Sequence, residues 1–334
     1  MSRRRVLLTG GTSLLVRRTA ERLLARGDDV VLVQRGRADI DIEQVQGDVR
    51  DPDAVGRAVA GCDAVVHAAA KVGVVGRWED YRSVNVDGTS VVLDAARAVG
   101  VRSMVYVSTP SVAHSGSSLF GAGAEPPFTG RHVTGRVGAF YAESKAIAEQ
   151  LALAAADDTM AVVAVRPHLV WGPGDTQLVG RIVDRARSGR LALIGGGTAL
   201  VDTTYVDNAA SALVAALDAA GPGMPCSGRA YVIANGEPRP VRELVESILH
   251  AAGVDATAKK VPLGIATVAG SLVERLWALR RTDEEPPLTR FLAEQLGTAH
   301  WFDPRPARDD LGWTPTVSLD QGFAELTRWF AERR

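Results

Sequence analysis

Val6-Leu-Leu-Thr-Gly-Gly-Thr12 is an apolar run that ends in a glycine turn, and a helical stretch from Leu14 to Arg26 follows it. Similar short apolar runs alternate with helical stretches through the first half of the chain, at Asp29 to Gln34, Ala64 to Ala68, Ser103 to Ser108 and Met160 to Arg166. Runs of this kind are typical of parallel strands that are buried on both faces. Their alternation with helices indicates βαβ units, so the sequence predicts an α/β fold with a doubly wound parallel sheet.

The pattern changes after Pro167, where turn clusters such as Trp171-Gly-Pro-Gly174 separate shorter elements. A chain of 334 residues exceeds the size that one core usually serves. We therefore expect residues 1–166 to form the sheet domain and residues 167–334 to form mainly a smaller, interleaved lobe. Tyr231 to Ala234 is again apolar, so a part near 201–235 is expected to return to the sheet.

Composition and charge exclude several classes of function. The formal net charge is -1, which gives no footprint for nucleic acid. Arg3-Arg-Arg5 precedes an apolar stretch that is broken at once, so no signal peptide is read and a cytoplasmic location is expected. Cys62 and Cys226 have no metal-ligand spacing, which favours two reduced thiols over a disulfide and predicts no metal site.

Tyr141 and Lys145 lie in the run Phe140-Tyr-Ala-Glu-Ser-Lys-Ala-Ile-Ala-Glu149, which is predicted to be helical. Positions i and i+4 share one face of a helix, so the phenol and the ammonium are expected side by side. A Tyr-x-x-x-Lys spacing is weak evidence alone, because ordinary helix surfaces supply it often. Its context strengthens it, since the strand upstream ends in the hydroxyls of Ser108, Thr109 and Ser111.

Together, the glycine turn, the hydroxyl-ended strand and the Tyr-x-x-x-Lys helix resemble the extended short-chain dehydrogenases/reductases, within them the 3β-hydroxysteroid dehydrogenase-like group. The resemblance covers essentially the whole chain and implies a Rossmann-like domain with a C-terminal substrate lobe. It implies that Tyr141 donates the proton in ketone reduction and that Lys145 lowers the pKa of this tyrosine and holds the nicotinamide ribose. Thr109 would be the third catalytic residue, with Ser111 as the fallback. Asn85 would order the site, or else be an amide on a helix surface.

The first βα turn of such a fold holds the pyrophosphate of a dinucleotide at a helix N-terminus. The family pattern there is Thr-Gly-x-x-Gly-x-x-Gly, whereas this chain reads Thr9-Gly-Gly-Thr-Ser-Leu-Leu-Val16 and keeps only the first patterned glycine. Three interpretations stay open: a site that binds after a small shift, a weakened enzyme, or a protein without redox chemistry. The Ser13 hydroxyl could bond a phosphate, whereas Val16 is expected to push the helix outward. The resemblance predicts these cofactor-binding residues: Gly10, Thr12, Ser13, Leu14, Leu15, Arg35, Asp48, Val49, Ala68, Ala69, Ala70, Lys145 and Pro167.

The strand that ends at Gln34 is not followed by the acid that takes the ribose hydroxyls in NAD-preferring members. Arg35 and Arg37 follow instead, and an arginine there can accommodate a 2′-phosphate. NADP(H) is therefore favoured over NAD(H), and a solvated loop is the alternative for both arginines. His67, at the end of another strand, is interpreted as a packing histidine.

Four runs are similar to a subgroup that reduces 2-alkyl-3-oxoalkanoates to 3-hydroxy acids in long-chain olefin and β-lactone biosynthesis: Ser108 to Val112, Arg166 to Asp175, Thr204 to Asn208 and His300 to Asp303. This resemblance implies a lipid-like substrate, a homodimer, and other enzymes of the same lipid pathway as partners. A long-chain β-keto acid needs an apolar cavity and a cation for its carboxylate. Candidates for the cation are Arg166, His168 and Arg290. A steroid dehydrogenase and a dinucleotide-responsive regulator remain the alternatives.

Val261 to Leu279 is an apolar run that contains Glu274-Arg275, and it is too short and too charged to span a bilayer, which needs about 20 apolar residues. We interpret it as a packed helix of the smaller lobe. In the alternative its apolar face lines a substrate entrance or lies on a membrane surface, which leaves peripheral membrane contact open. With Leu288 to Leu296 it is expected to build the substrate cavity. The glycine-rich stretch His114 to Gly138 is predicted to be a mobile flap.

Overall fold

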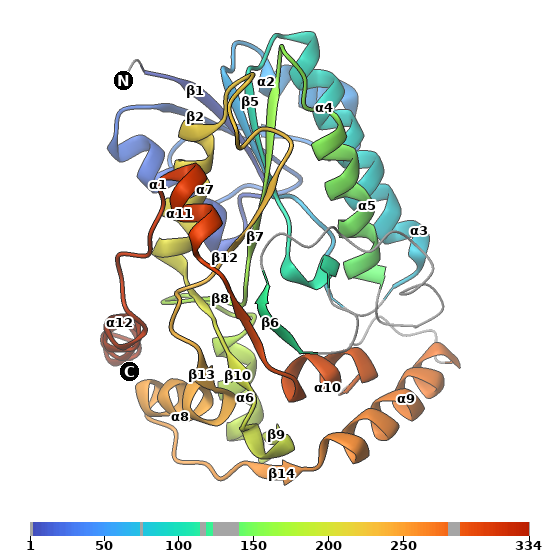
Figure 1. The fold of residues 1–334 in the computed structure, drawn as a ribbon, viewed down its shortest axis with the longest axis vertical. Helices are drawn as coiled ribbons and strands as arrows, with labels where there is room; N and C mark the ends of the chain where they lie inside the picture. The colour runs from blue at the N-terminus through green and yellow to red at the C-terminus, as the bar shows by residue number, and fades with distance from the viewer. Residues whose placement is uncertain (1–2, 74–75, 114–117, 123–139, 280–287, 334) are drawn as a thin grey trace.

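The computed structural model describes residues 3–73, 76–113, 118–122, 140–279 and 288–333. These residues form two lobes. The larger lobe, at the top of the view, carries helices on both faces of a sheet, and the smaller lobe below it holds shorter strands and helices (Figure 1). Segments after Pro167 belong to both lobes, so the chain crosses between them more than once.

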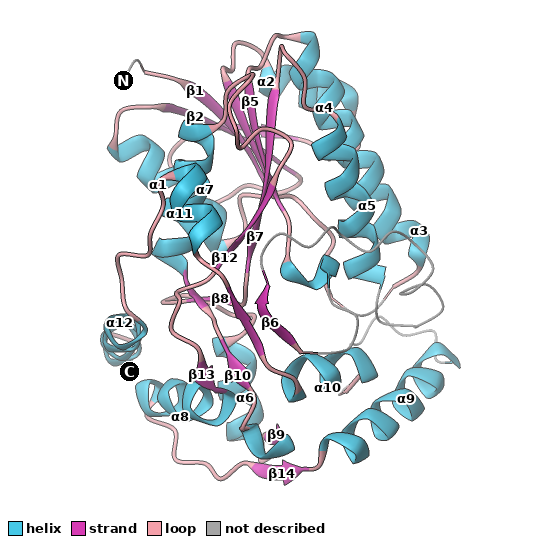
Figure 2. Ribbon diagram, viewed as in Figure 1, coloured by secondary structure: helices cyan, strands magenta, loops and turns pink. Residues whose placement is uncertain are grey.

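Seven parallel strands make the sheet of the larger lobe: β1 (Arg5–Thr9), β2 (Asp29–Gln34), β3 (Glu43–Gln46), β4 (Ala64–His67), β5 (Ser103–Val107), β7 (Ala161–Pro167) and β12 (Ala230–Ile233). Their order is β12-β7-β5-β4-β1-β2-β3, so the chain winds outward from β1 first in one direction and then in the other. Figure 2 shows the strands of this sheet in magenta with helices in cyan on both sides of them. Leu7 in β1 lies beside Val31 on one side and Val65 on the other. This arrangement confirms the predicted α/β, doubly wound fold.

Helices cover both faces of the sheet because successive strand residues point to opposite sides. Leu8 packs in the core on the face covered by α1 (Leu14–Ala25), α7 (Val206–Ala219) and α11 (Arg305–Leu311). Leu7 packs on the opposite face, which is covered by α2 (Pro52–Val59), α4 (Gly88–Ala98) and α5 (Phe140–Ala154). A short helix α3 (Trp78–Tyr81) and one turn of π-helix (Arg82–Asp87) lead directly into α4.

The smaller lobe is built around a four-stranded sheet in the order β13 (Arg239–Pro240), β10 (Leu200–Val201), β15 (His300–Phe302) and β6 (Leu119–Ala122). Two strand pairs and five helices complete it: β8 (Val170–Trp171) with β11 (Thr204–Tyr205), β9 (Ala192–Ile194) with β14 (Lys259–Val261), and α6 (Val179–Arg187), α8 (Val241–Ala252), α9 (Leu263–Leu279), α10 (Arg290–Gly297) and α12 (Leu319–Ala331). Trp171 stacks on Phe323 of α12 with ring centroids 4.4 Å apart, which fixes the C-terminal helix against this lobe.

Three strands differ from the sequence-based expectations. β3 was not foreseen, because its residues Glu43-Gln-Val-Gln46 are mostly polar, as suits the edge of a sheet. β15 was not predicted as a strand either. β6 lies within the predicted flap from His114 to Gly138 and pairs with β15, so Leu119–Ala122 form part of a sheet. Most of the other flap residues lie outside the described part of the chain.

Cys62 and Cys226 are both buried free thiols. Among the helices described here, none is long and apolar enough to cross a membrane. In the described part of the chain, no group of three or more His, Cys, Asp or Glu side chains is placed to hold a metal ion.

Candidate active site

The turn between β1 and α1 depends on Gly10. This residue has a φ of +83°, and a Cβ there would lie 3.0 Å from the backbone N and Cα of Ala69. Only glycine combines that backbone conformation with so close an approach. The helix α1 then begins after Ser13, whose side chain makes no capping hydrogen bond, and its first turn carries no acid. Its free N–H groups and the Ser13 hydroxyl therefore suit an anion.

Val16 is buried within the core that α1 shares with the sheet, together with Leu8 and Leu32. Its branched side chain therefore contributes to the packing of α1 on the sheet. The expectation that Val16 pushes α1 outward, away from a bound pyrophosphate, stays a prediction.

A cavity of about 860 Å³ opens beyond the carboxyl ends of β1, β2 and β3. In doubly wound sheets, ligands bind in this position. Seven of the predicted cofactor residues line it: Gly10, Thr12, Arg35, Asp48, Val49, Ala69 and Ala70. The other six predicted residues do not line it. Ser13 is exposed at the start of α1. Five are partly or fully buried beside the turn or the strand ends: Leu14, Leu15, Ala68, Lys145 and Pro167.

Gln34 is the last residue of β2, directly before Arg35. Its side chain is buried, and its Oε1 accepts no hydrogen bond within the described structure. A buried acceptor without a partner costs about 1 to 3 kcal/mol. Gln34 lines the cavity, but its Oε1 is buried away from the cavity surface.

Arg50 is a cation of this cavity that the sequence analysis missed. Its guanidinium contacts Asp48 through two bonds, each of 2.8 Å, and this contact, helped by Arg35, holds the pKa of the Asp48 carboxyl below its usual value. Asp48 therefore stays ionised and keeps Arg50 beside Arg35. Arg50 could have been found from the sequence as a basic residue two places after Asp48, but the family pattern does not include it.

His67 joins the glycine turn to the π-helix through a directed chain of hydrogen bonds. Thr9 Oγ1 accepts the N–H groups of Ala68 at 3.1 Å and Ala69 at 2.9 Å, so its own hydrogen points to His67 Nδ1 at 2.8 Å. His67 Nε2 then donates to Thr89 Oγ1 at 3.0 Å, and Thr89 donates to the Asn85 carbonyl at 2.6 Å. Complete burial lowers the pKa of His67 to about 3, which keeps the ring neutral, as this series of hydrogen bonds requires.

Asn85 is buried in the π-helix and is not an amide on a helix surface. Its Oδ1 accepts the Lys71 N–H at 2.7 Å, and its Nδ2 donates to the Lys71 carbonyl at 3.1 Å and to Ser144 Oγ at 2.8 Å. Ser144 in turn donates to the Tyr141 carbonyl at 2.9 Å. Asn85 therefore holds the strand-end segment at Lys71 against the first turn of α5.

The structure brings Tyr141, Lys145 and Thr109 together. Tyr141 and Lys145 are one turn apart on α5, and Thr109, which follows β5, lies near enough to the Tyr141 hydroxyl to affect its pKa. Burial raises the pKa of Tyr141 to about 12, and the Thr109 hydroxyl opposes that rise. Ser111 contacts the same threonine, with Thr109 Oγ1 and Ser111 Oγ 3.2 Å apart.

Lys145 does not lower the tyrosine pKa here as we expected. Its ammonium donates to the Val107 carbonyl at 2.6 Å and lies 4.1 Å from the centre of the Tyr106 ring. Burial lowers the pKa of Lys145 to about 7, whereas Glu149, one turn further along α5, raises it. Burial therefore disfavours the charged form of Lys145, and the pKa of Tyr141 is governed by its own desolvation.

The three cations proposed for a substrate carboxylate are already engaged. Arg166 pairs with Glu149 through two nitrogens, and both side chains are fully buried, so this arginine serves the glutamate. His168 Nδ1 bonds the Asp202 carbonyl at 2.6 Å. Arg290 Nε bonds Glu294 at 2.7 Å. Sequence reasoning could not foresee these partners, because they are contributed mainly by other elements.

Lys71 is a further residue that the sequence analysis missed. It lines the cavity immediately after Ala70, and its ammonium lies 5.3 Å from the centre of the Tyr81 ring. In the described part of the chain, no carboxylate forms an ion pair with it. Lys71 could have been found from the sequence as a lysine directly after the run Ala68-Ala-Ala70.

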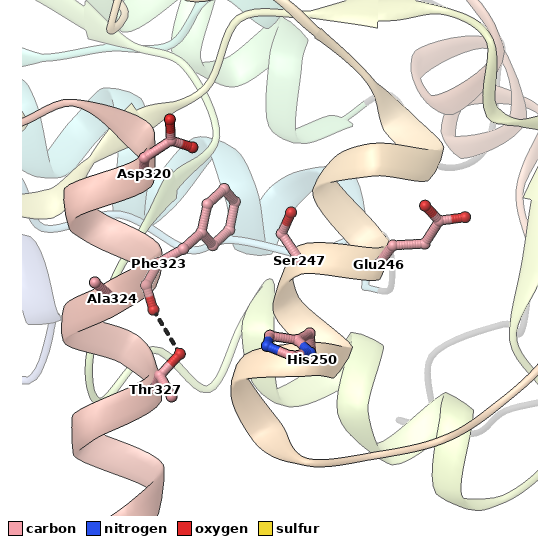
Figure 3. Close-up of a pocket in the computed structure, with 7 residues that line it drawn as sticks. All are labelled: Glu246, Ser247, His250, Asp320, Phe323, Ala324 and Thr327. Atoms are coloured by element: carbon pink, nitrogen blue, oxygen red, sulfur yellow. Dashed lines mark hydrogen bonds between the residues drawn. The ribbon is translucent and has the colours of Figure 1, made fainter.

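A second cavity, of about 480 Å³, lies between α8 and α12 (Figure 3). Its lining includes Glu246, His250 and Asp320, and Thr327 there donates to the Phe323 carbonyl at 2.9 Å. None of the predicted catalytic or cofactor residues lines it.

The nucleotide-type cavity and the partly buried Tyr-x-x-x-Lys site together define an extended short-chain dehydrogenase/reductase. Residues 26–263 match the 3-beta hydroxysteroid dehydrogenase/isomerase family, and the chain belongs to this family. It is a nicotinamide-dependent oxidoreductase of the kind that acts on hydroxyl or ketone groups.

The chain is similar to two bacterial proteins named 2-alkyl-3-oxoalkanoate reductase. The one from Stenotrophomonas maltophilia (strain K279a) is 47% identical over 327 residues, which cover 96% of this chain and 98% of the relative. The one from Shewanella oneidensis (strain MR-1) is 38% identical, with 96% and 84% covered. Among solved structures, a UDP-glucuronic acid 4-epimerase from Bacillus cereus in complex with NAD has a TM-score of 0.74 at 18% identity, with 98% of this chain and 99% of that chain covered. This likeness shows the shared fold.

Proposed function

We propose that this protein reduces a 2-alkyl-3-oxoalkanoate to the 3-hydroxy acid with NADPH. The observation that carries the proposal is the cluster of Tyr141, Lys145 and Thr109, in which Lys145 is buried and the other two are partly buried, together with a cavity suited to a dinucleotide. The two similar reductases support the substrate class. A homodimer, a cytoplasmic location and partners in a lipid pathway remain predictions of the sequence.

In this proposal the bound nicotinamide supplies the hydride, and the side chains manage the proton. The Tyr141 phenol, with a pKa of about 12, stays protonated at neutral pH and can give its proton to the substrate oxygen. The Thr109 hydroxyl lies near the Tyr141 hydroxyl and would donate a hydrogen bond to the same substrate oxygen. When Tyr141 loses its proton, the nearby Lys145 would favour the phenolate by taking up the charged form. Lys145 could then also hold the ribose of the cofactor.

The cavity residues that would hold the dinucleotide follow from the same geometry. The start of α1 and Ser13 would bind the pyrophosphate. Arg35 and Arg50 would face a 2′-phosphate, which supports NADPH over NADH.

Arg35→Ala is expected to weaken NADPH binding by about 1.5 to 3 kcal/mol, as for a hydrogen bond to a charged group, and to leave NADH binding nearly unchanged. Titration of nicotinamide fluorescence measures both affinities. Arg37→Ala is the matched control, because Arg37 is exposed on the same loop and does not line the cavity. Equal affinities of the unmutated protein for NADPH and NADH would contradict the proposed preference.

Lys71 is the cation that we assign to the substrate carboxylate, in place of the three engaged candidates. Lys71→Gln is expected to raise KM for a 2-alkyl-3-oxo acid about tenfold or more, because it removes a charge-assisted hydrogen bond. KM for the corresponding ketone without a carboxyl group should stay the same. Steady-state NADPH oxidation with both substrates tests this, and Lys71→Arg should restore part of the loss. An equal change for acid and ketone would show that Lys71 does not bind the carboxylate.

Steroid oxidation is the second candidate function, and the family to which the chain belongs favours it. A dinucleotide-responsive regulator is the third, and the departure of Ser13 and Val16 from the glycine pattern favours it. One assay separates the three: NADPH oxidation with a 2-alkyl-3-oxo acid, set against turnover of a 3β-hydroxysteroid with NAD or NADP. A regulator would bind the cofactor and turn over neither substrate.

A further inference from the structure

The helix α9 presents an apolar face to solvent. Ile265, Val268, Leu272 and Leu276 are 62%, 63%, 54% and 58% exposed. Their spacing of three, four and four residues places them on one side of the helix. Large exposed apolar patches on a soluble protein mark contact sites.

The opposite side of α9 explains why this face has no cover. Ala266 is buried and packs with Ala293 of α10. A Cβ on Gly270 would lie 2.5 Å from the backbone nitrogen of Arg290, so the two helices touch at their backbones. Because α9 rests on α10 through its small residues, its large residues point away from α10.

Among the described residues, the exposed charged groups next to this apolar face are basic. Arg275 is exposed beside Leu276, whereas Glu274 accepts the backbone N–H of Arg290 at 2.8 Å and faces inward. Lys259 and Lys260 are exposed on β14, directly before the helix. The described part of α9 therefore offers apolar side chains with only cations at its exposed rim. An ordinary surface helix shows the reverse pattern, with polar residues outward.

The position of α9 leaves this face accessible. Figure 1 shows α9 and β14 together at the end of the smaller lobe that lies farthest from the large sheet. A helix with apolar residues on one face and basic residues at its edges binds in the plane of an anionic membrane surface. A protein partner would commonly require directional polar groups as well, and the exposed face of α9 supplies only Arg275.

We propose that the exposed face of α9, comprising Ile265, Val268, Leu272 and Leu276 with Lys259, Lys260 and Arg275, binds the surface of a bilayer that contains anionic phospholipids. The helix would lie in the interface with its apolar residues among the acyl chains. The contact is peripheral, and it would hold the smaller lobe at a source of alkyl-chain compounds. The proposal rests on this face alone and does not require the redox activity.

Flotation with lipid vesicles tests the proposal on the full-length protein. The unmutated chain is expected to float with vesicles of phosphatidylcholine and phosphatidylglycerol, and to float much less with phosphatidylcholine alone. Val268→Glu with Leu272→Glu should weaken binding about tenfold or more, and Lys259→Glu with Lys260→Glu should do so through charge. Leu24→Glu is the matched control, because Leu24 is an exposed apolar residue on α1 in the other lobe. It should bind as the unmutated protein does.

Circular dichroism and thermal unfolding check that each variant is folded, which is expected because every substitution is at an exposed position. Tyr141→Phe should bind vesicles like the unmutated protein, so a failure of the proposed chemistry leaves this test intact. Failure of the unmutated protein to float with anionic vesicles would overturn the proposal. So would unchanged binding in the double glutamate variant. A dimer that this variant converts to a monomer, without vesicle binding by the unmutated protein, would assign the face to a second copy of the chain.

Discussion

Tyr141→Phe is expected to lower kcat for ketone reduction by roughly 10²- to 10⁴-fold, the usual contribution of a general acid. The variant keeps the ring and removes only the hydroxyl, which lies near Thr109. Burial gives this hydroxyl a pKa of about 12, so it is protonated and able to donate at neutral pH. The Kd for NADPH should change little, because Tyr141 lies outside the residues that line the cofactor cavity.

Single-turnover reduction and a fluorescence titration of NADPH separate the two effects. Tyr106→Phe is a matched control, since the Tyr106 hydroxyl is buried without a hydrogen-bond partner in the described structure, and its ring, which supports Lys145, is retained. That control should keep most of its turnover. More than about a tenth of the original turnover in Tyr141→Phe would assign the proton to another group.

Arg166→Met is expected to destabilise the fold by about 3 to 5 kcal/mol. The substitution leaves the Glu149 carboxylate buried without its partner, and the exposed fractions of the two side chains are only 0% for Glu149 and 1% for Arg166. A charge so placed cannot be rehydrated without opening the packing between α5 and β7. The free energy of unfolding from urea denaturation measures the loss.

The double variant Glu149→Leu with Arg166→Met removes both charges and should recover most of that stability, as replaced buried ion pairs often do. Arg308→Met is the comparison for an exposed pair, since Arg308 and Asp309 are 2.9 Å apart with side chains 55% and 60% exposed. Such a pair contributes at most about 1 kcal/mol. If Arg166→Met were no more destabilising than Arg308→Met, the buried pair would not be the support that its geometry indicates.

Local sequence patterns were enough to predict the large sheet and the catalytic helix. The apolar runs of β1, β2, β4, β5 and β7 are buried strands whatever their neighbours, because the burial of both faces requires apolar residues at every position. Tyr141 and Lys145 share a face because the α-helix has a fixed period. Gly10 marked its turn because few other residues adopt its backbone conformation.

Contacts between segments distant in sequence were decided only by the tertiary structure. β3 is too polar to read as a strand until β2 supplies its hydrogen bonds, and β15 depends on β6 and β10 in the same way. From the sequence, Arg166 was a candidate free cation, but in the structure it pairs with Glu149 of α5. Asn85 was equally compatible with a surface amide, but in the structure it bonds Ser144. The outward face of α9 was likewise hidden, because an apolar residue in a sequence does not reveal whether another element will cover it. Periodicity is a property of a segment, whereas pairing and burial depend on the whole packed chain.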